Sequence, residues 1–149
     1  HKNPMYRAFR CDKLTLALME RILRGYSEKS PGKNNLAYQL LSTPRKTLQK
    51  RGEIELSLIS RKVVARLGIT LLDTIVEAGS GSLPVRSIES AALRFHPDDM
   101  KPTELAQRFR MQEPPVVGYI KGNSFTIDLK AIQVTRIKDL ANAIGKVLS

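Results

Sequence analysis

A helix over residues 13–26 is the first element that the hydrophobic pattern predicts. Its apolar residues follow one another at intervals of four positions: Leu14, Leu18, Ile22 and Tyr26. Further apolar residues widen this stripe, and the charged residues between them leave one polar side. Asp12 is placed to cap the helix at its start. A stripe this wide predicts a helix that is largely buried against another layer.

A second helical segment is predicted over residues 44–66. Ser42 or Thr43 supplies the cap, and Pro44 suits the first turn. Gly52 is the weak point of this helix, because glycine inside a helix costs about 1 kcal/mol relative to alanine. Glu53 and Glu55 are two residues apart, so they point in different directions and do not form an acid–base pair.

From residue 69 onward the pattern changes to that of strands. Residues 69–79 and 87–95 are rich in β-branched residues, and two further runs flank a turn at residues 121–124. A short helix follows Pro102, with Leu105 and Phe109 on its buried edge, and Thr135 is placed to cap a last amphipathic helix.

The order strand, strand, helix, strand, strand, helix predicts an α+β lobe. In such a lobe a mostly antiparallel sheet carries its helices on one face. We therefore expect two parts: a helical connector over residues 1–66 and an α+β C-terminal lobe over residues 67–149.

The charge of the chain points to an anionic partner. Lys and Arg number 25 against 14 Asp and Glu, a formal net charge of +11. Residues 44–66 form the densest basic window, which indicates either contact with nucleic acid or a solvated helix. Aromatic residues make up only 5% of the chain, which disfavours recognition by base stacking.

Other features of the sequence indicate where in the cell we expect the protein to be. No apolar run approaches the roughly 20 residues of a membrane span, and the start of the chain carries no signal-peptide pattern. The single cysteine, Cys11, cannot form an internal disulfide, so we expect a reducing, cytoplasmic location.

Arg7 and Arg10, three residues apart just before the first helix, are the leading candidates for a site. Arginine keeps its charge and offers a planar fork that grips oxyanions, and a helix start adds positive potential. The alternative is a solvated pair, with one arginine on Asp12. Cys11, between Arg10 and Asp12, is either a nucleophile or, as is more common for a lone cysteine, a small, partly buried hydrophobe.

Two other motifs are weaker candidates. The stretch GSGSLP at residues 79–84 resembles a phosphate-binding loop, but it leads into a strand and is better explained as a connection between strands. His96 with Asp98 and Asp99 suggests metal ligands, but no second histidine cluster accompanies them, and a helix-capping turn explains them better.

Four stretches taken in order resemble one family. They are NPMYRAFRCDKLTLALMERILRGY, ARLGITLLDTIVEAGSGSLP, SIESAALRF and EPPVVGYIKGNSFTIDLKAI. Together they resemble the C-terminal part of bacterial selenocysteine synthase, the L-seryl-tRNA(Sec) selenium transferase family. The resemblance implies a fold-type-I pyridoxal phosphate enzyme that converts seryl-tRNA(Sec) to selenocysteinyl-tRNA(Sec) with selenophosphate.

The resemblance also assigns roles within the chain. Arg7 and Arg10 match the family's R-x-x-R element, which holds the selenium-donor anion. The family's Schiff-base lysine and its other cofactor-binding residues lie upstream, so we expect this segment alone to bind no pyridoxal phosphate, to hold no metal and to be inactive. The resemblance further implies tRNA(Sec) as partner and a homo-oligomer of dimers assembled into a ring, with no membrane.

Two alternatives remain open from the residues. One is a related pyridoxal phosphate-dependent lyase that acts on a phosphorylated sugar acid, which would also need an arginine clamp. The other is a basic RNA-binding module without catalysis.

Overall fold

The computed structural model describes residues 5, 10–28, 32, 35–77 and 87–148, and these form two compact units. The first unit ends at Gln39 and the second begins at Leu40. The expected connector over residues 1–66 and lobe over 67–149 divide the chain at a different place. That division stays a prediction about the domains of a larger protein, but the second unit itself contains every described residue from Leu40 onward.

The first unit is built around helix α2 (Lys13–Ser27), which confirms the helix that the hydrophobic pattern predicts. Asp12 caps it, because its side chain accepts a hydrogen bond from the backbone N–H of Thr15 at 2.9 Å. Tyr26 contacts Tyr38 of α3 (Leu36–Ser42) edge to face, with ring centroids 6.1 Å apart.

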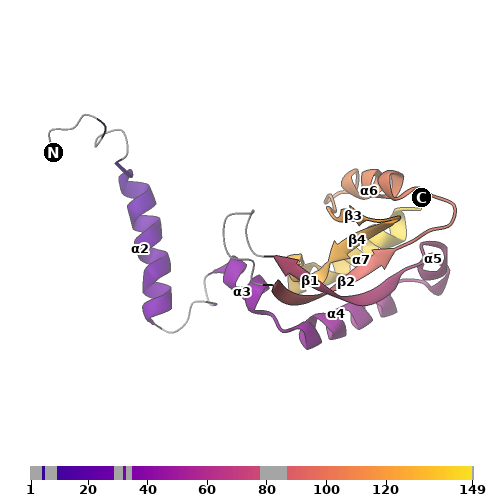
Figure 1. Ribbon diagram of the computed structural model, residues 1–149, viewed down its shortest axis with the longest axis horizontal. Coiled ribbons are helices and arrows are strands. Elements are labelled where there is room, and N and C mark those ends of the chain that lie inside the picture. Colours follow the sequence, from indigo (N-terminus) through magenta and orange to yellow (C-terminus); the bar gives the residue numbers. More distant parts are fainter. Residues whose placement is uncertain (1–4, 6–9, 29–31, 33–34, 78–86, 149) are drawn as a thin grey trace. The chain divides into compact units, whose positions relative to one another are not determined.

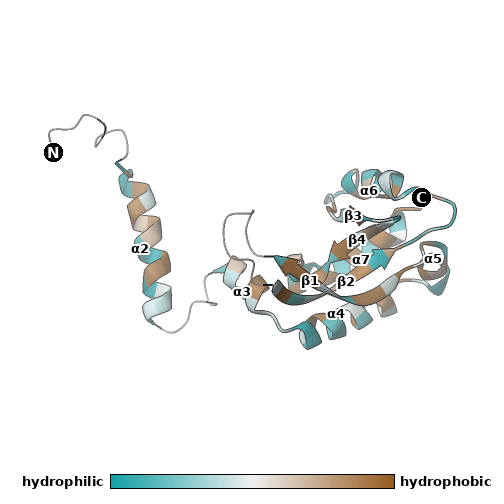
Figure 2. Cartoon of the chain, in the orientation of Figure 1, coloured by the Kyte–Doolittle hydropathy of each residue, from teal (hydrophilic) through white to brown (hydrophobic). Residues whose placement is uncertain are grey.

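The predicted burial of α2 is not found in this chain. None of its residues is buried, and Leu14 is 69% exposed. Figure 2 shows apolar residues running along the helix. The sequence pattern therefore indicates an apolar surface that is suited to packing, and within the first unit Tyr38 contacts it at Tyr26.

The second unit is an α+β lobe around an antiparallel sheet, as the order of elements predicts (Figure 1). Its four strands lie in the order β1-β2-β4-β3, and each neighbouring pair is antiparallel. The strands are β1 (Thr70–Glu77), β2 (Ser87–Phe95), β3 (Tyr119–Lys121) and β4 (Ser124–Asp128). The helical elements are α4 (Arg45–Leu58), α5 (Arg61–Arg66), α6 (Pro102–Arg110), η1 (Leu129–Ala131), η2 (Val134–Arg136) and α7 (Ile137–Lys146).

One face of the sheet carries the hydrophobic core. Leu93 lies opposite Ile127, and Phe95 lies opposite Phe125, so these four side chains share a face. The helices add Leu48 from α4, Phe109 from α6 and Ile144 from α7 to the same cluster, and these side chains have 0% exposure. The rings of Phe109 and Phe125 stack with centroids 5.2 Å apart.

Two local predictions are wrong. The helix over residues 44–66 does not weaken at Gly52; it divides at Ile59 and Ser60, where the Ser60 side chain caps α5. The last helix is not capped by Thr135, because η2 occupies residues 134–136 and α7 begins at Ile137 without a side-chain cap.

Candidate functional site

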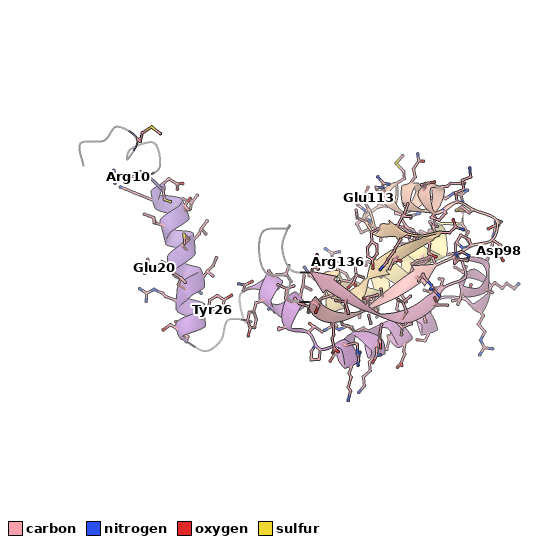
Figure 3. The ribbon with its side chains drawn as sticks, viewed as in Figure 1. Arg10, Glu20, Tyr26, Asp98, Glu113 and Arg136 are labelled. Atoms are coloured by element: carbon pink, nitrogen blue, oxygen red, sulfur yellow. The ribbon has the colours of Figure 1, made fainter. Side chains whose placement is uncertain are left out.

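Arg10 lies two residues before the Asp12 cap of α2 and is exposed. Figure 3 shows its side chain extending away from the helix. Among the described residues it makes no ion pair, so the alternative in which Asp12 neutralises it does not occur. The Arg10 guanidinium is therefore exposed and has no carboxylate partner among the described residues.

Asp12 is instead committed to the helix. It accepts hydrogen bonds from the Thr15 hydroxyl at 2.7 Å and from the Thr15 backbone N–H at 2.9 Å. These two bonds, the hydroxyl first, lower the pKa of the Asp12 carboxyl below its ordinary value. The carboxylate thus stays charged while it caps α2, and its two hydrogen bonds go to Thr15 rather than to Arg10.

The other half of the predicted pair lies outside the described residues. Arg7 falls in residues 6–9, and the GSGSLP stretch falls in residues 78–86, so neither candidate is placed. Cys11 is described and is an exposed free thiol, so the prediction of a partly buried hydrophobe is wrong.

His96, Asp98 and Asp99 do not gather into a metal site. The His96 Nδ1 lies 2.8 Å from the Asn123 carbonyl oxygen and 3.1 Å from the Ser124 hydroxyl, whereas Asp99 pairs with Arg66 at 3.3 Å. Across the described ranges, no group of three or more His, Cys, Asp and Glu side chains could hold a metal ion. The N-cap of α6 is Lys101, so the capping role predicted for this turn is also wrong.

Glu55 is a buried carboxyl, which the sequence pattern did not predict. It is 1% exposed, and neither side-chain oxygen has a hydrogen-bond partner among the described residues. Burial raises the pKa of Glu55 from 4.5 to about 8, so the folded protein holds it neutral at pH 7. The spacing of Leu48, Gly52 and Glu55 on one side of α4 is the signal that would have found it.

Lys130 is a second buried ionisable residue. It is 4% exposed, and its Nζ donates to the Thr43 carbonyl at 2.8 Å and to the Leu41 carbonyl at 3.4 Å. Burial lowers the pKa of this lysine, and the charge of Asp128 opposes that effect. The ammonium ties the end of α3 and the residue that follows it to η1, which is a structural role.

The second face of the sheet carries a hollow of about 870 Å³. The strand register brings three of its lining residues side by side: Arg94 lies opposite Thr126, and Thr126 lies opposite Tyr119. Burial and the nearby Asp128 raise the pKa of Tyr119. The hollow is lined by Arg45, Leu72, Asp73, Thr74, Ile75, Glu89, Arg94, Tyr119, Lys121, Gly122, Ser124 and Thr126.

Most polar groups around this hollow already have partners inside the protein. Asp128 accepts hydrogen bonds from Thr74 at 2.9 Å and from Ser90 at 2.6 Å. Arg45 lies 3.5 Å from Asp73 and 3.6 Å from Glu89. These bonds hold the sheet together, whereas Lys121 is exposed and makes no ion pair among the described residues.

None of the described helices is long and apolar enough to cross a membrane.

Comparison with known proteins identifies the family. A family model described as L-seryl-tRNA selenium transferase matches residues 1–133. An L-seryl-tRNA(Sec) selenium transferase of Desulfotalea psychrophila is 30% identical over 133 residues, which is 89% of this chain and 28% of that relative. The one of Aquifex aeolicus is 29% identical over 148 residues, 99% of this chain and 32% of the relative.

A third relative, from Escherichia coli O9:H4, has the same name and is 32% identical over 140 residues, covering 88% of this chain and 29% of the relative. The chain thus spans less than a third of the length of each of these three relatives. The family model covers the greater part of both compact units and includes both candidate arginines. The chain therefore belongs to the L-seryl-tRNA selenium transferase family.

Proposed function

We propose that this chain is the C-terminal portion of a transferase that converts seryl-tRNA(Sec) to selenocysteinyl-tRNA(Sec) with selenophosphate. The observation that carries the proposal is the family match over residues 1–133. The relatives named L-seryl-tRNA(Sec) selenium transferase align with 88–99% of the chain. The net charge of +11 is compatible with a tRNA substrate and a cytoplasmic enzyme.

Within that enzyme, Arg7 and Arg10 hold the selenium-donor anion. A phosphate-containing donor calls for permanent cations that bind two oxygens at once, and a guanidinium does this where an ammonium cannot. Arg10 supports this role because it is exposed and makes no ion pair among the described residues. The capped start of α2 adds the positive end of a helix close by.

The described residues do not fit pyridoxal phosphate. Lys130 is their buried lysine, and two backbone carbonyls occupy its ammonium. Lys121 lines the hollow on the sheet but is exposed, whereas a Schiff-base lysine is activated by a desolvated site. We assign the lysine and the cofactor to the remainder of the whole enzyme, so this segment alone is inactive.

The apolar surface of α2 supports a place inside a larger assembly. At about 100° per residue, its apolar positions from Leu14 to Tyr26 cover an arc of about 200° on the helix. An arc of that width is more than one layer can bury. In the proposed enzyme, residues 1–66 connect to the large domain, residues 67–149 form the small lobe, and the subunits form dimers that assemble into a ring.

The proposed binding of the selenium donor by Arg7 and Arg10, the arginine clamp, is tested in the full-length protein that carries this segment. The substrates are seryl-tRNA(Sec) and selenophosphate. We expect Arg10→Ala to lower kcat/KM for selenophosphate by about 10²-fold, because a preorganised cationic donor is lost. Arg7→Lys keeps the positive charge but loses the planar guanidinium that binds two oxygens at once. We expect this variant to lower kcat/KM for selenophosphate by less than Arg10→Ala does.

Arg21→Ala is the matched control, because Arg21 lies on α2, is exposed and makes no ion pair among the described residues. It should keep activity within about twofold. Undiminished selenocysteine formation in both Arg7→Lys and Arg10→Ala would contradict the proposed role of the two arginines in binding the selenium donor. Turnover of a phosphorylated sugar acid without tRNA would instead support the lyase alternative.

A further inference from the structure

Residues 46–62 of α4 and α5 carry an excess of positive charge that the fold leaves unpaired. Five cations lie in this basic segment, and none makes an ion pair within the described part of the chain: Lys46, Lys50, Arg51, Arg61 and Lys62. The cations on either side behave differently. Arg45 pairs with Asp73 and Glu89, and Arg66 pairs with Asp99.

The acidic residues of the basic segment do not offset this charge. Glu53 is exposed, but Glu55 points into the core, and its raised pKa of about 8 leaves it neutral at pH 7. The segment thus presents four exposed cations and the half-buried Arg51 against one exposed carboxylate. Figure 2 shows hydrophilic residues along the first half of α4 and over α5.

The packing of α4 fixes which way these cations point. Leu48, Gly52 and Glu55 are buried against the lobe, so the opposite side of the helix must face outward. Lys46 and Lys50 lie four residues apart on that outward side, one above the other. Figure 3 shows long side chains of α4 extending away from the sheet.

We infer that the outward face of α4 and the start of α5 bind the sugar-phosphate backbone of RNA. Phosphodiesters are the anions that a row of exposed, unpaired Lys and Arg side chains fits, and such contact needs no base recognition. The low aromatic content of the chain agrees with a backbone contact rather than with base stacking. The inference rests on the proposed function in one respect: it takes the RNA to be the tRNA substrate.

The test measures binding of the 149-residue chain to a fluorescein-labelled transcript of the selenocysteine tRNA between 50 and 300 mM salt, about the range in which phosphate contacts weaken. The wild type should give a log–log salt slope of about −4, as expected for five phosphate contacts. The variant K46Q/K50Q/R51Q/R61Q/K62Q should lose most of that slope and bind at least about tenfold more weakly at low salt.

The matched control removes the same charge elsewhere on the lobe, in the variant K101Q/R110Q/K121Q/K138Q/K146Q. These five cations are exposed and make no ion pair among the described residues. The control should keep a slope within about one of the wild type. Circular dichroism checks that both variants keep the fold.

Equal loss in both variants overturns the inference, as does an unchanged slope in the first variant. So does competition by polyglutamate as strong as by RNA of equal charge, because the partner would then be an acidic protein surface. None of these measurements involves the cofactor or the selenium donor. A failure here is therefore distinguishable from a failure of the transferase proposal, which is judged by product formation.

Discussion

At the scale of the residue, Glu55 couples protonation to stability. Its pKa is about 8 in the folded protein and 4.5 as an ordinary glutamate, so between these values the folded state binds the extra proton. The stabilising contribution is complete below pH 4.5 and is lost as pH rises through about 8. The free energy of unfolding should therefore fall with rising pH across this window.

We expect a slope of up to about 1.4 kcal/mol per pH unit in the wild type, measured by urea unfolding at several pH values. Glu55→Gln removes the titrating group and should flatten the slope. Glu53→Gln, on the exposed side of the same helix, should leave it unchanged. A wild-type stability that rises between pH 5 and 8 would contradict the neutral state of Glu55.

At the scale of the element, α4 shows why Gly52 lies in the middle of a helix. A Cβ at this position would meet the Leu71 and Leu129 side chains at less than ordinary van der Waals distance. The missing side chain lets α4 lie close to β1. The stabilisation from this close packing outweighs the cost of placing glycine inside a helix. The residue that looks like a helix breaker in the sequence is a contact point in the fold.

Gly52→Ala should therefore lower the free energy of unfolding by about 1–3 kcal/mol, because overpacking exceeds the gain in propensity. Gly145→Ala in α7 is the control, since a Cβ there meets nothing within 4 Å. It should leave stability unchanged or raise it by up to about 1 kcal/mol. The comparison uses thermal unfolding, and a stabilised Gly52→Ala would show that Leu71 can move aside.

At the scale of the whole molecule, the exposed apolar surface of α2 has a consequence for the chain alone. Leu18 and Ile22 are 57% and 51% exposed, and contiguous apolar surface of this kind drives association. We expect sedimentation of the 149-residue chain to give a mass above 16.7 kDa. The triple variant Leu14→Ser, Leu18→Ser and Ile22→Ser should return the mass to that of a monomer.

The thermal midpoint of the lobe should not change in that variant, because α2 belongs to the other compact unit. A wild-type chain that remains monomeric at high concentration would contradict this expectation. So would a triple variant that still associates, since the driving surface would then lie elsewhere.

The fold was predictable where local pattern and tertiary packing agree. The β-branched runs around Thr74 and the alternation of Phe125 and Ile127 gave the sheet, and Leu105 and Phe109 gave the buried edge of α6. Gly52 was misinterpreted because its role depends on Leu71, which lies in a strand beyond the end of α4.

The candidate site was predictable only as residue types. The R-x-x-R spacing pointed to Arg10, but whether Asp12 pairs with it depends on Asp12 bonding to Thr15, which the sequence does not decide. Glu55 was missed because an acidic residue in a basic window suggests solvent. Its inward position follows only when the period from Leu48 through Gly52 is taken as the buried side.

The strand order β1-β2-β4-β3 also bears on how the lobe folds. β1 with β2 and β3 with β4 are neighbours along the chain, so each hairpin can form from nearby residues. The seam between β2 and β4, where Phe95 lies opposite Phe125, joins them across a longer stretch of chain. We therefore expect the meeting of the two hairpins at that seam to be the slow step of folding, because its contacts join residues that are distant in the sequence.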